Sequence, residues 1–142
     1  ELVQFHFHHP SEHILDGTRF ELECHFVHRS ATGALAVIGV FIRSGAAHPA
    51  IQTIWDAMPL KEGPEVVSAS KIDPAALLPV DTGFFRYAGS LTTPPCSEGI
   101  TWTVLKSPIE ASADQIKRFA QLFPMNARPL QNPNRRFLLE TM

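Results

Sequence analysis

Three histidines near the start of the chain have the spacing of a metal site. His6 and His8 lie two residues apart in an alternating apolar and polar run, and His25 lies in a second run of this kind. Side chains two apart on a strand point to the same face, so His6 and His8 project together, and a hairpin would bring His25 alongside them. Three neutral imidazoles with one open position are the ligand set of catalytic zinc, whereas a structural site normally adds a fourth protein ligand. The sequence therefore predicts a catalytic Zn2+ site.

Two polar residues on the same strand faces strengthen this prediction. A ligating imidazole needs an acceptor at its other nitrogen, which fixes the tautomer and the direction of the ring. Gln4 shares the face of His6, and Glu23 shares the face of His25. We therefore expect Gln4 to hold His6 and Glu23 to hold His25. Without His25 and these partners, an H-x-H pair more often lines a solvated strand face.

The remaining histidines near these strands are not predicted to be ligands. His9 and His28 have the opposite strand parity, and His13 lies outside the alternating runs. We expect all three to be hydrogen-bonded histidines in the core or at its rim.

The elements that must position these residues are mainly strands. Asp16 and Gly17 supply a strong turn signal between the two histidine-bearing runs. Ser112 and Gln115 form a capping box that opens a helix with an apolar stripe. Strands are expected over residues 2–9, 20–28, 36–43, 84–87, 99–106 and 136–140, and two further helices over 49–58 and 74–77. The pattern indicates a mostly β (α+β) domain with a few short helices.

Composition sets limits on the class of protein. With 142 residues, 44% of them hydrophobic, the chain is expected to form a single domain over residues 1–142. A net charge of -2 gives no electrostatic reason to expect nucleic acid as a partner. No apolar run approaches the ~20 residues of a membrane-spanning helix. The alternating pattern starts directly after Glu1 with no turn or cap, and we expect the chain to lack its N-terminal part.

Several motifs, in order and over nearly the whole chain, resemble the alpha-class carbonic anhydrases, in particular the bacterial branch. They are residues 4–13 (QFHFHHPSEH), 21–28 (ELECHFVH), 87–95 (YAGSLTTPP), 101–105 (TWTVL) and 126–129 (NARP). The resemblance implies the fold of this family without its N-terminal part. That fold is a large mixed, mainly antiparallel sheet with a few short peripheral helices.

The resemblance also implies a zinc-dependent lyase that reversibly hydrates carbon dioxide to bicarbonate and a proton. His6, His8 and His25 would be the zinc ligands, and zinc-bound hydroxide would attack the substrate. Thr92 would accept a hydrogen bond from that hydroxide, and Glu12 would accept the Thr92 hydroxyl proton. A threonine whose proton is committed to a carboxylate offers only a lone pair toward the metal. It therefore favours and orients a ligand that still carries a proton.

Further roles follow from the same resemblance. Tyr87 would be a supporting hydroxyl in the network behind Thr92, and Thr93 would lie on the polar side where bicarbonate forms. The Pro94–Pro95 peptide bond is expected to be cis. An apolar substrate pocket would be lined by Val27, Val37, Leu91 and Trp102, although each of these residues, taken alone, is more often plain core.

The two cysteines, taken alone, leave either a bridge or two free thiols open. In bacterial members of the family, the cysteine after the paired prolines bonds to one in the upstream segment, where a proton-shuttling histidine also lies. The resemblance therefore implies an unpaired Cys96, a buried free thiol at Cys24 and a periplasmic or secreted protein. Carbon dioxide and bicarbonate are the implied small-molecule partners, and a homodimer stays open.

Two other functions compete with the enzyme. A catalytically silent binding module of the same fold would usually have lost a zinc histidine, whereas the full ligand set is present here. A cupin-like metal-binding β domain could use an H-x-H strand, but it does not account for residues 91–95. Metal content and hydration kinetics would separate the three.

Overall fold

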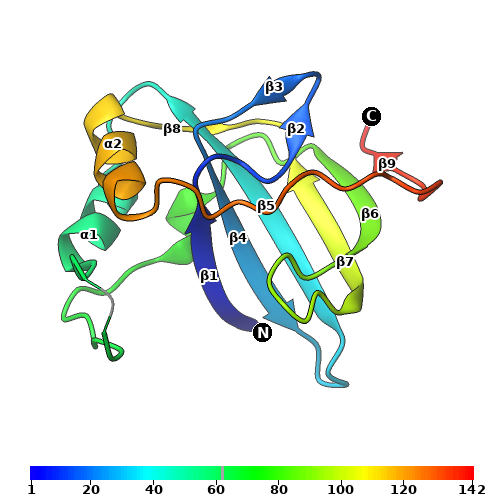
Figure 1. The fold of residues 1–142 in the computed structure, drawn as a ribbon, viewed down its shortest axis with the longest axis horizontal. Coiled ribbons are helices and arrows are strands. Elements are labelled where there is room, and N and C mark those ends of the chain that lie inside the picture. The colour runs from blue at the N-terminus through cyan, green and yellow to red at the C-terminus, as the bar shows by residue number, and fades with distance from the viewer. Residues whose placement is uncertain (62) are drawn as a thin grey trace.

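A curved sheet of seven strands forms the centre of the computed structural model, which describes residues 1–61 and 63–142 (Figure 1). In spatial order the strands are β1 (Leu2–His8), β4 (Leu22–Arg29), β5 (Leu35–Ser44), β7 (Glu98–Leu105), β6 (Phe84–Ser90) and β9 (Leu139–Glu140), with β8 (Ile109–Ala111) beside β5. The remaining elements are the hairpin of β2 (Ile14–Leu15) and β3 (Thr18–Arg19), the helices α1 (Pro49–Ala57) and α2 (Ala113–Leu122), and the 3-10 helix η1 (Pro74–Leu77).

The sheet is mixed and mainly antiparallel, as expected. Strand β5 pairs in parallel with β7 and β8, and the other neighbours pair antiparallel. Strand β5 has a nearly continuous apolar sequence because both of its faces are covered. Its residues Val37, Val40, Phe41 and Ile42 are almost completely buried. The predicted strands agree with the observed ones to within a few residues, while β8 and the short β2–β3 hairpin lay outside the predicted elements.

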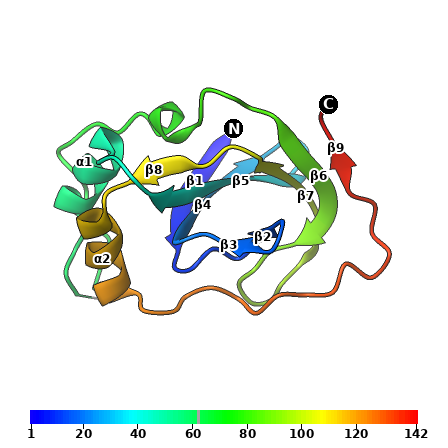
Figure 2. The same ribbon diagram turned by 90° about the horizontal axis from the view of Figure 1, so that it is seen from above.

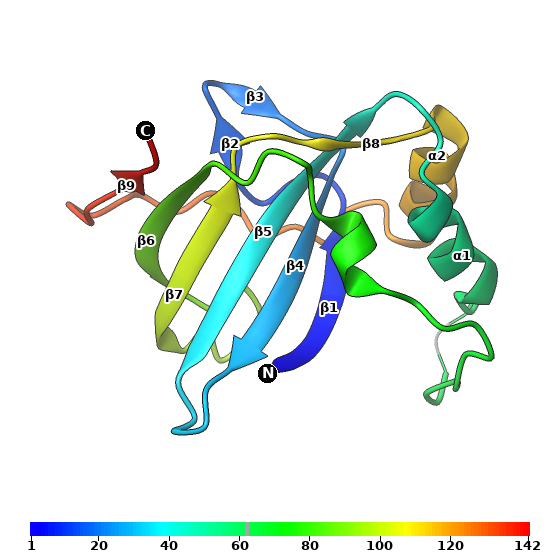
Figure 3. The ribbon, with the colours of Figure 1, turned by 180° about the vertical axis from the view of Figure 1, so that it is seen from behind.

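Two apolar cores lie on the two faces of the sheet. One core contains Phe7 and Phe26 and is closed by α1 and α2, where Trp55 and Phe119 stack with ring centroids 5.0 Å apart. Cys24 is a free thiol inside this core, as predicted, and burial raises its pKa. The two helices lie beside each other at the β1 end of the sheet (Figure 3). The second core lies on the opposite face and contains the apolar residues Val27, Val37, Phe41, Ile100, Trp102 and Val104.

The turn at Asp16 and Gly17 has the form that the sequence predicts. Both residues have positive φ, 49° and 77°, and the flanking residues Leu15 and Thr18 pair. This is the backbone of a two-residue hairpin loop, for which an Asp-Gly pair is suited. The small β2–β3 hairpin leads the chain from β1 back into β4, so that the two histidine-bearing strands become antiparallel neighbours.

Two long connecting segments lie along opposite faces of the sheet (Figure 2). Residues 58–61 and 63–83, which include η1, lie between α1 and β6 on one face, and residues 123–138 follow α2 on the other. The capping box of Ser112 and Gln115 forms as predicted and starts α2. Within residues 1–61 and 63–142, no helix has the length and apolar character needed to cross a bilayer. The segment after α2 passes the end of β1 and takes part in the site described next.

Candidate metal centre

The three predicted ligand histidines converge on one point. Strands β1 and β4 pair with His6 directly opposite His25, and His8 lies on the same face of β1. The ring centroids are 4.9 Å apart for His6 and His8, 5.3 Å for His6 and His25, and 4.5 Å for His8 and His25. One ring nitrogen of each residue lies within 4.8 Å of those of the other two. Strand parity and register therefore bring the three imidazoles together, as expected.

Each imidazole has one nitrogen held by an oxygen outside the cluster. The bonds are His6 Nδ1 to Gln4 Oε1 (2.8 Å), His8 Nδ1 to the Asn126 carbonyl (3.0 Å) and His25 Nε2 to Glu23 Oε1 (2.9 Å). A carbonyl or carboxylate oxygen can only accept, so each of these ring nitrogens carries the proton. The predicted pairs of Gln4 with His6 and of Glu23 with His25 are both present. Lone pairs remain on His6 Nε2, His8 Nε2 and His25 Nδ1.

The donor set fits a zinc ion. His8 Nε2 is buried and has no hydrogen-bond partner in the described part of the chain. A buried polar atom without a partner costs free energy, and a bound cation would satisfy it. Three neutral imidazole nitrogens are the ligands of many catalytic zinc sites and leave a position for water. The residues thus meet the chemical requirements of the predicted metal.

Glu23 is the buried anion behind the ligands. Its side chain is completely buried, and it accepts four hydrogen bonds. Oε1 accepts from His25 and from His13 Nδ1 (2.6 Å), and Oε2 accepts the backbone N–H groups of Glu12 and His13 (both 2.9 Å). His13 Nε2 in turn lies 2.7 Å from the Tyr87 hydroxyl. His13 is therefore hydrogen-bonded as expected, but its position links Tyr87 to the carboxylate that holds a ligand.

The electrostatics keep the two ligands on β1 neutral and the carboxylate charged. Burial, together with His25 and His8, lowers the pKa of His6 to about 4. Burial and His25 also lower the pKa of His8. Burial opposes ionisation of Glu23, but its bonds and charge interaction with His13 and His25 hold its pKa well below the usual range. Burial opposes the charged form of His13 as well, and Glu23 outweighs it and raises the pKa of His13.

Space for the Glu23 carboxylate comes from a glycine on the neighbouring strand. Gly39 of β5 pairs directly with His25 of β4. A Cβ atom at Gly39 would lie 2.8 Å from Glu23 Oε1. Close approach of a polar group to the backbone is one of the reasons for a glycine inside a strand. Gly39 thus allows the carboxylate to reach both imidazoles.

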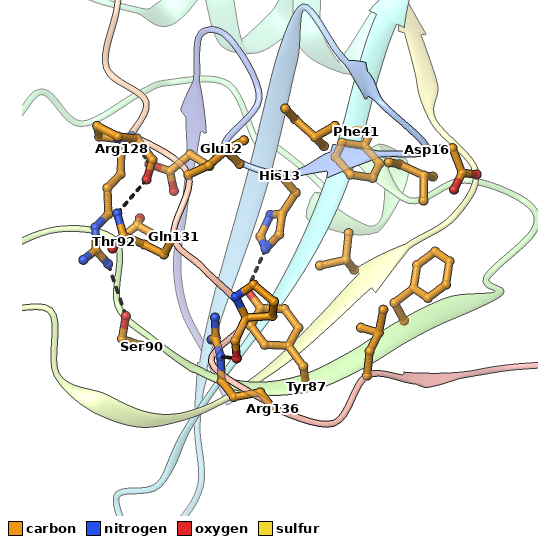
Figure 4. A pocket seen from close by; sticks show the side chains of 18 of the residues that line it. Glu12, His13, Asp16, Phe41, Tyr87, Ser90, Thr92, Arg128, Gln131 and Arg136 are labelled. Carbon is orange, nitrogen blue, oxygen red and sulfur yellow. Dashed lines mark hydrogen bonds between the residues drawn. The ribbon is translucent and has the colours of Figure 1, made fainter.

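Glu12 lies beside the cluster with one oxygen free. Its Oε1 accepts the backbone N–H of Arg128 (2.6 Å), while its Oε2 is buried, has no hydrogen-bond partner among the described residues and lies 3.8 Å from His25 Nδ1. The predicted hydrogen bond from Thr92 to Glu12 is not formed in this structure. Both residues line one cavity of about 430 Å³ (Figure 4). His6, His8 and His25 do not line it, so this cavity borders Glu12 and His13 and not the histidine cluster.

Comparisons with known proteins point to one family. The family model of the eukaryotic-type carbonic anhydrases matches residues 1–139. The chain belongs to this family. A carbonic anhydrase of Nostoc sp. is 51% identical over 143 residues, covering 100% of this chain and 54% of that protein. The chain spans about half the length of the curated carbonic anhydrases it matches, and family membership excludes the cupin-like alternative.

Solved carbonic anhydrases share the fold closely. A hyperthermostable carbonic anhydrase from an active hydrothermal vent chimney superposes with a TM-score of 0.95 at 44% identity, covering 99% of this chain and 64% of that one. The alpha-carbonic anhydrase of Thermovibrio ammonificans, solved with the inhibitor sulfanilamide, gives a TM-score of 0.93 at 43% identity, covering 96% and 61%. Both the fold class and the recognised family are thereby confirmed.

The residues expected to form the carbonic anhydrase substrate wall lie close together. Val27, Val37 and Trp102 belong to one buried cluster, and Leu91 packs against it. The Trp102 ring centroid lies 4.8 Å from that of His25. Thr93 is exposed and its carbonyl accepts the N–H of the unpaired Cys96 at 2.9 Å. The Pro94–Pro95 peptide bond is cis, as expected. Contact of these five residues with substrate stays a prediction.

Sequence reasoning missed three groups in this carbonic anhydrase site. Asn126 and Arg128 hold His8 and Glu12 through backbone atoms, and Gly39 contributes only space. These contributions come from backbone atoms or from the absence of a side chain, so a search for reactive side chains does not find them. Residues 126–129 did belong to the motifs that carried the resemblance, and this was the one available signal.

Replacing Gly39 by alanine is expected to weaken zinc binding by about 10- to 100-fold, the scale on which partners of metal ligands act. The added methyl group would collide with Glu23 Oε1 and shift the carboxylate that aims His25. Competition with a chelator measures the zinc affinity. The matched control is Gly63→Ala, because nothing lies within 4 Å of a Cβ atom there. Equal zinc affinities of the two variants would contradict this role of Gly39.

Metal-free protein is expected to lose stability as the pH falls from 6.5 toward about 4. His6 takes up a proton at its ordinary pKa of 6.5 when unfolded, but only at about 4 when folded. Between these values the unfolded state binds more protons, so the free energy of unfolding decreases as the pH decreases. Urea unfolding across this window measures the effect. In His6→Ala, the free energy of unfolding should depend less steeply on pH than in the wild type. An unchanged slope would show that His6 does not cause the effect.

Proposed function

We propose that this protein catalyses the reversible hydration of carbon dioxide to bicarbonate with a zinc ion held by His6, His8 and His25. The observation that carries the proposal is the convergence of three imidazole lone pairs whose opposite nitrogens are all committed to acceptors. A bound zinc ion supplies the Lewis acidity that turns water into a nucleophile near neutral pH, a chemistry for which carbonic anhydrase is itself the standard example.

Glu12 and Thr92 would select and orient the nucleophile. Glu12 Oε2 is a buried acceptor with no hydrogen-bond donor among the described residues. Thr92, whose hydroxyl could donate to it, lines the same cavity as Glu12. Once Thr92 donates its proton to Glu12, its oxygen can only accept a hydrogen bond. It then favours a nucleophile that carries a proton and turns the lone pair of that nucleophile toward the substrate.

The apolar cluster beside the histidines would bind carbon dioxide. Val27, Val37, Leu91 and Trp102 present hydrocarbon and aromatic surface and no charge, which suits a small apolar molecule and excludes water. The Trp102 indole N–H is already bonded to the Ser90 carbonyl at 2.9 Å, so it makes no competing polar contact with the substrate. Thr93, exposed next to this wall, offers the polar group toward which bicarbonate can form.

The remaining alternative is a silent binding module of the same fold. Retention of all three ligands with their hydrogen-bond partners favours the enzyme. Zinc content by elemental analysis and stopped-flow carbon dioxide hydration decide between them. Stoichiometric zinc with no hydration above the buffer rate would support the silent module and refute the proposed function.

His25→Ala is expected to abolish tight zinc binding, because two imidazoles do not provide the ligand number that zinc requires. Elemental analysis after dialysis against a chelator measures the retained metal. The control is His28→Ala, since His28 lies on the same strand but bonds to the Phe26 carbonyl, away from the cluster. Stoichiometric zinc in His25→Ala would show that the ligand assignment is wrong.

Thr92→Ala is expected to keep its zinc while turnover falls by about 10²–10³, the effect of losing one positioned catalytic hydrogen bond. Hydration kinetics and metal analysis on the same sample separate the two properties. Thr92→Ser retains the hydroxyl and should restore most of the rate. Wild-type turnover in Thr92→Ala would remove Thr92 from the mechanism.

A further inference from the structure

We propose that the side chain of Asn126 is a positioning residue for the metal ligand His8, an inference that rests on the proposed zinc site. Asn126 lies in the irregular segment after α2, far in sequence from the ligand strand β1. Its backbone carbonyl accepts the His8 Nδ1 proton at 3.0 Å. The inference is that its side-chain amide keeps this carbonyl in place.

The side-chain amide of Asn126 forms hydrogen bonds with the backbone on both sides of His8, and we call this set of contacts the Asn126 clamp. Its Oδ1 accepts the His9 backbone N–H at 2.7 Å, and its Nδ2 donates to the Phe7 carbonyl at 3.0 Å. The Asn126 backbone N–H donates to the His9 carbonyl at 3.1 Å. Together with the bond to the imidazole, four hydrogen bonds connect this one residue to residues 7–9.

These hydrogen bonds join residues 7–9, at the end of β1, to the irregular segment after α2. The side-chain amide offers one donor and one acceptor to the backbone on either side of His8, as a peptide group would. Residues 124–130 form no regular element, and the neighbouring Met125 is exposed. Four hydrogen bonds therefore fix the carbonyl that holds His8: the two side-chain bonds, the Asn126 backbone N–H bond to the His9 carbonyl, and the bond that the nearby Pro124 carbonyl accepts from His9 Nδ1 at 2.9 Å.

A second acceptor makes the clamp important for His8. Glu12 Oε1 lies 3.5 Å from His8 Nδ1, while it accepts the N–H of Arg128 at 2.6 Å. If the Asn126 carbonyl moved away, the imidazole could turn toward this carboxylate and carry its Nε2 lone pair out of the cluster. The same short segment thus holds His8 at Asn126 and Glu12 at Arg128. Asn126 acts on the metal through His8 and does not touch the reacting atoms.

Two substitutions test the clamp. Asn126→Ala removes both side-chain bonds, and the nearly isosteric Asn126→Asp keeps the acceptor but places an oxygen against the Phe7 carbonyl. Both are expected to weaken zinc binding, measured by chelator competition, by about 10- to 100-fold. The control is Ser112→Ala, which removes the cap of α2 and so lowers stability without touching the site.

The second readout is the ring tautomer of His8 in the metal-free protein, observed by long-range ¹⁵N–¹H correlation. Wild type and Ser112→Ala are expected to show a protonated Nδ1, and both Asn126 variants a mixture of tautomers. Wild-type zinc affinity and tautomer in folded Asn126→Asp would overturn the proposal, and so would an equal affinity loss in Ser112→Ala. A wild-type protein that binds no zinc would refute the proposed function, while the tautomer measurement would still decide the role of Asn126.

Discussion

The three imidazoles of the site must each keep a proton on the ring nitrogen that faces away from the cluster. A neutral imidazole has one lone pair, and that lone pair faces the cluster only if the opposite nitrogen keeps its proton. Gln4, Glu23 and the Asn126 carbonyl each accept one of these protons. Their oxygens come from a strand residue two positions away or from a segment that returns after more than a hundred residues. The site therefore forms only when β1 and β4 have the correct side-chain faces and the segment after α2 has reached β1.

Burying a carboxylate behind the ligands has a cost that the surroundings must offset. An ion withdrawn from water loses its hydration, and a pair of charges recovers that loss only when the remaining lone pairs are also bonded. Glu23 meets this requirement with two backbone donors and two imidazole donors. Because Gly39 leaves the carboxylate room and Tyr87 orients His13, the support of His25 uses residues from the three strands β4, β5 and β6.

The elements with regular periodicity could be predicted from the sequence, and the contacts made by irregular segments could not. The alternation around His6 and His25 indicated the correct faces, the pairing of β1 with β4 and two of the three outer acceptors. The support of His8 comes from a backbone carbonyl of a distant irregular segment, and the space for Glu23 from a missing side chain. A glycine inside a strand indicates a close approach to the backbone but does not identify the group that approaches. Glu12 and Thr92 lie in loops. The motif resemblance predicted that they lie near each other, but it could not predict the distance between their side chains.

The register between β1 and β4 has a consequence for folding. A shift of β1 against β4 by one residue would carry Gln4, His6 and His8 to the opposite face of the sheet and bury them among the aromatic rings of the helical side. An ion that binds only the correctly aligned pair stabilises that pairing over every slipped one, by an amount that grows with its free concentration. A bound metal would therefore favour the correct alignment of β1 with β4, a pairing in which a register shift between Leu2 and Gln4 already disturbs the ladder.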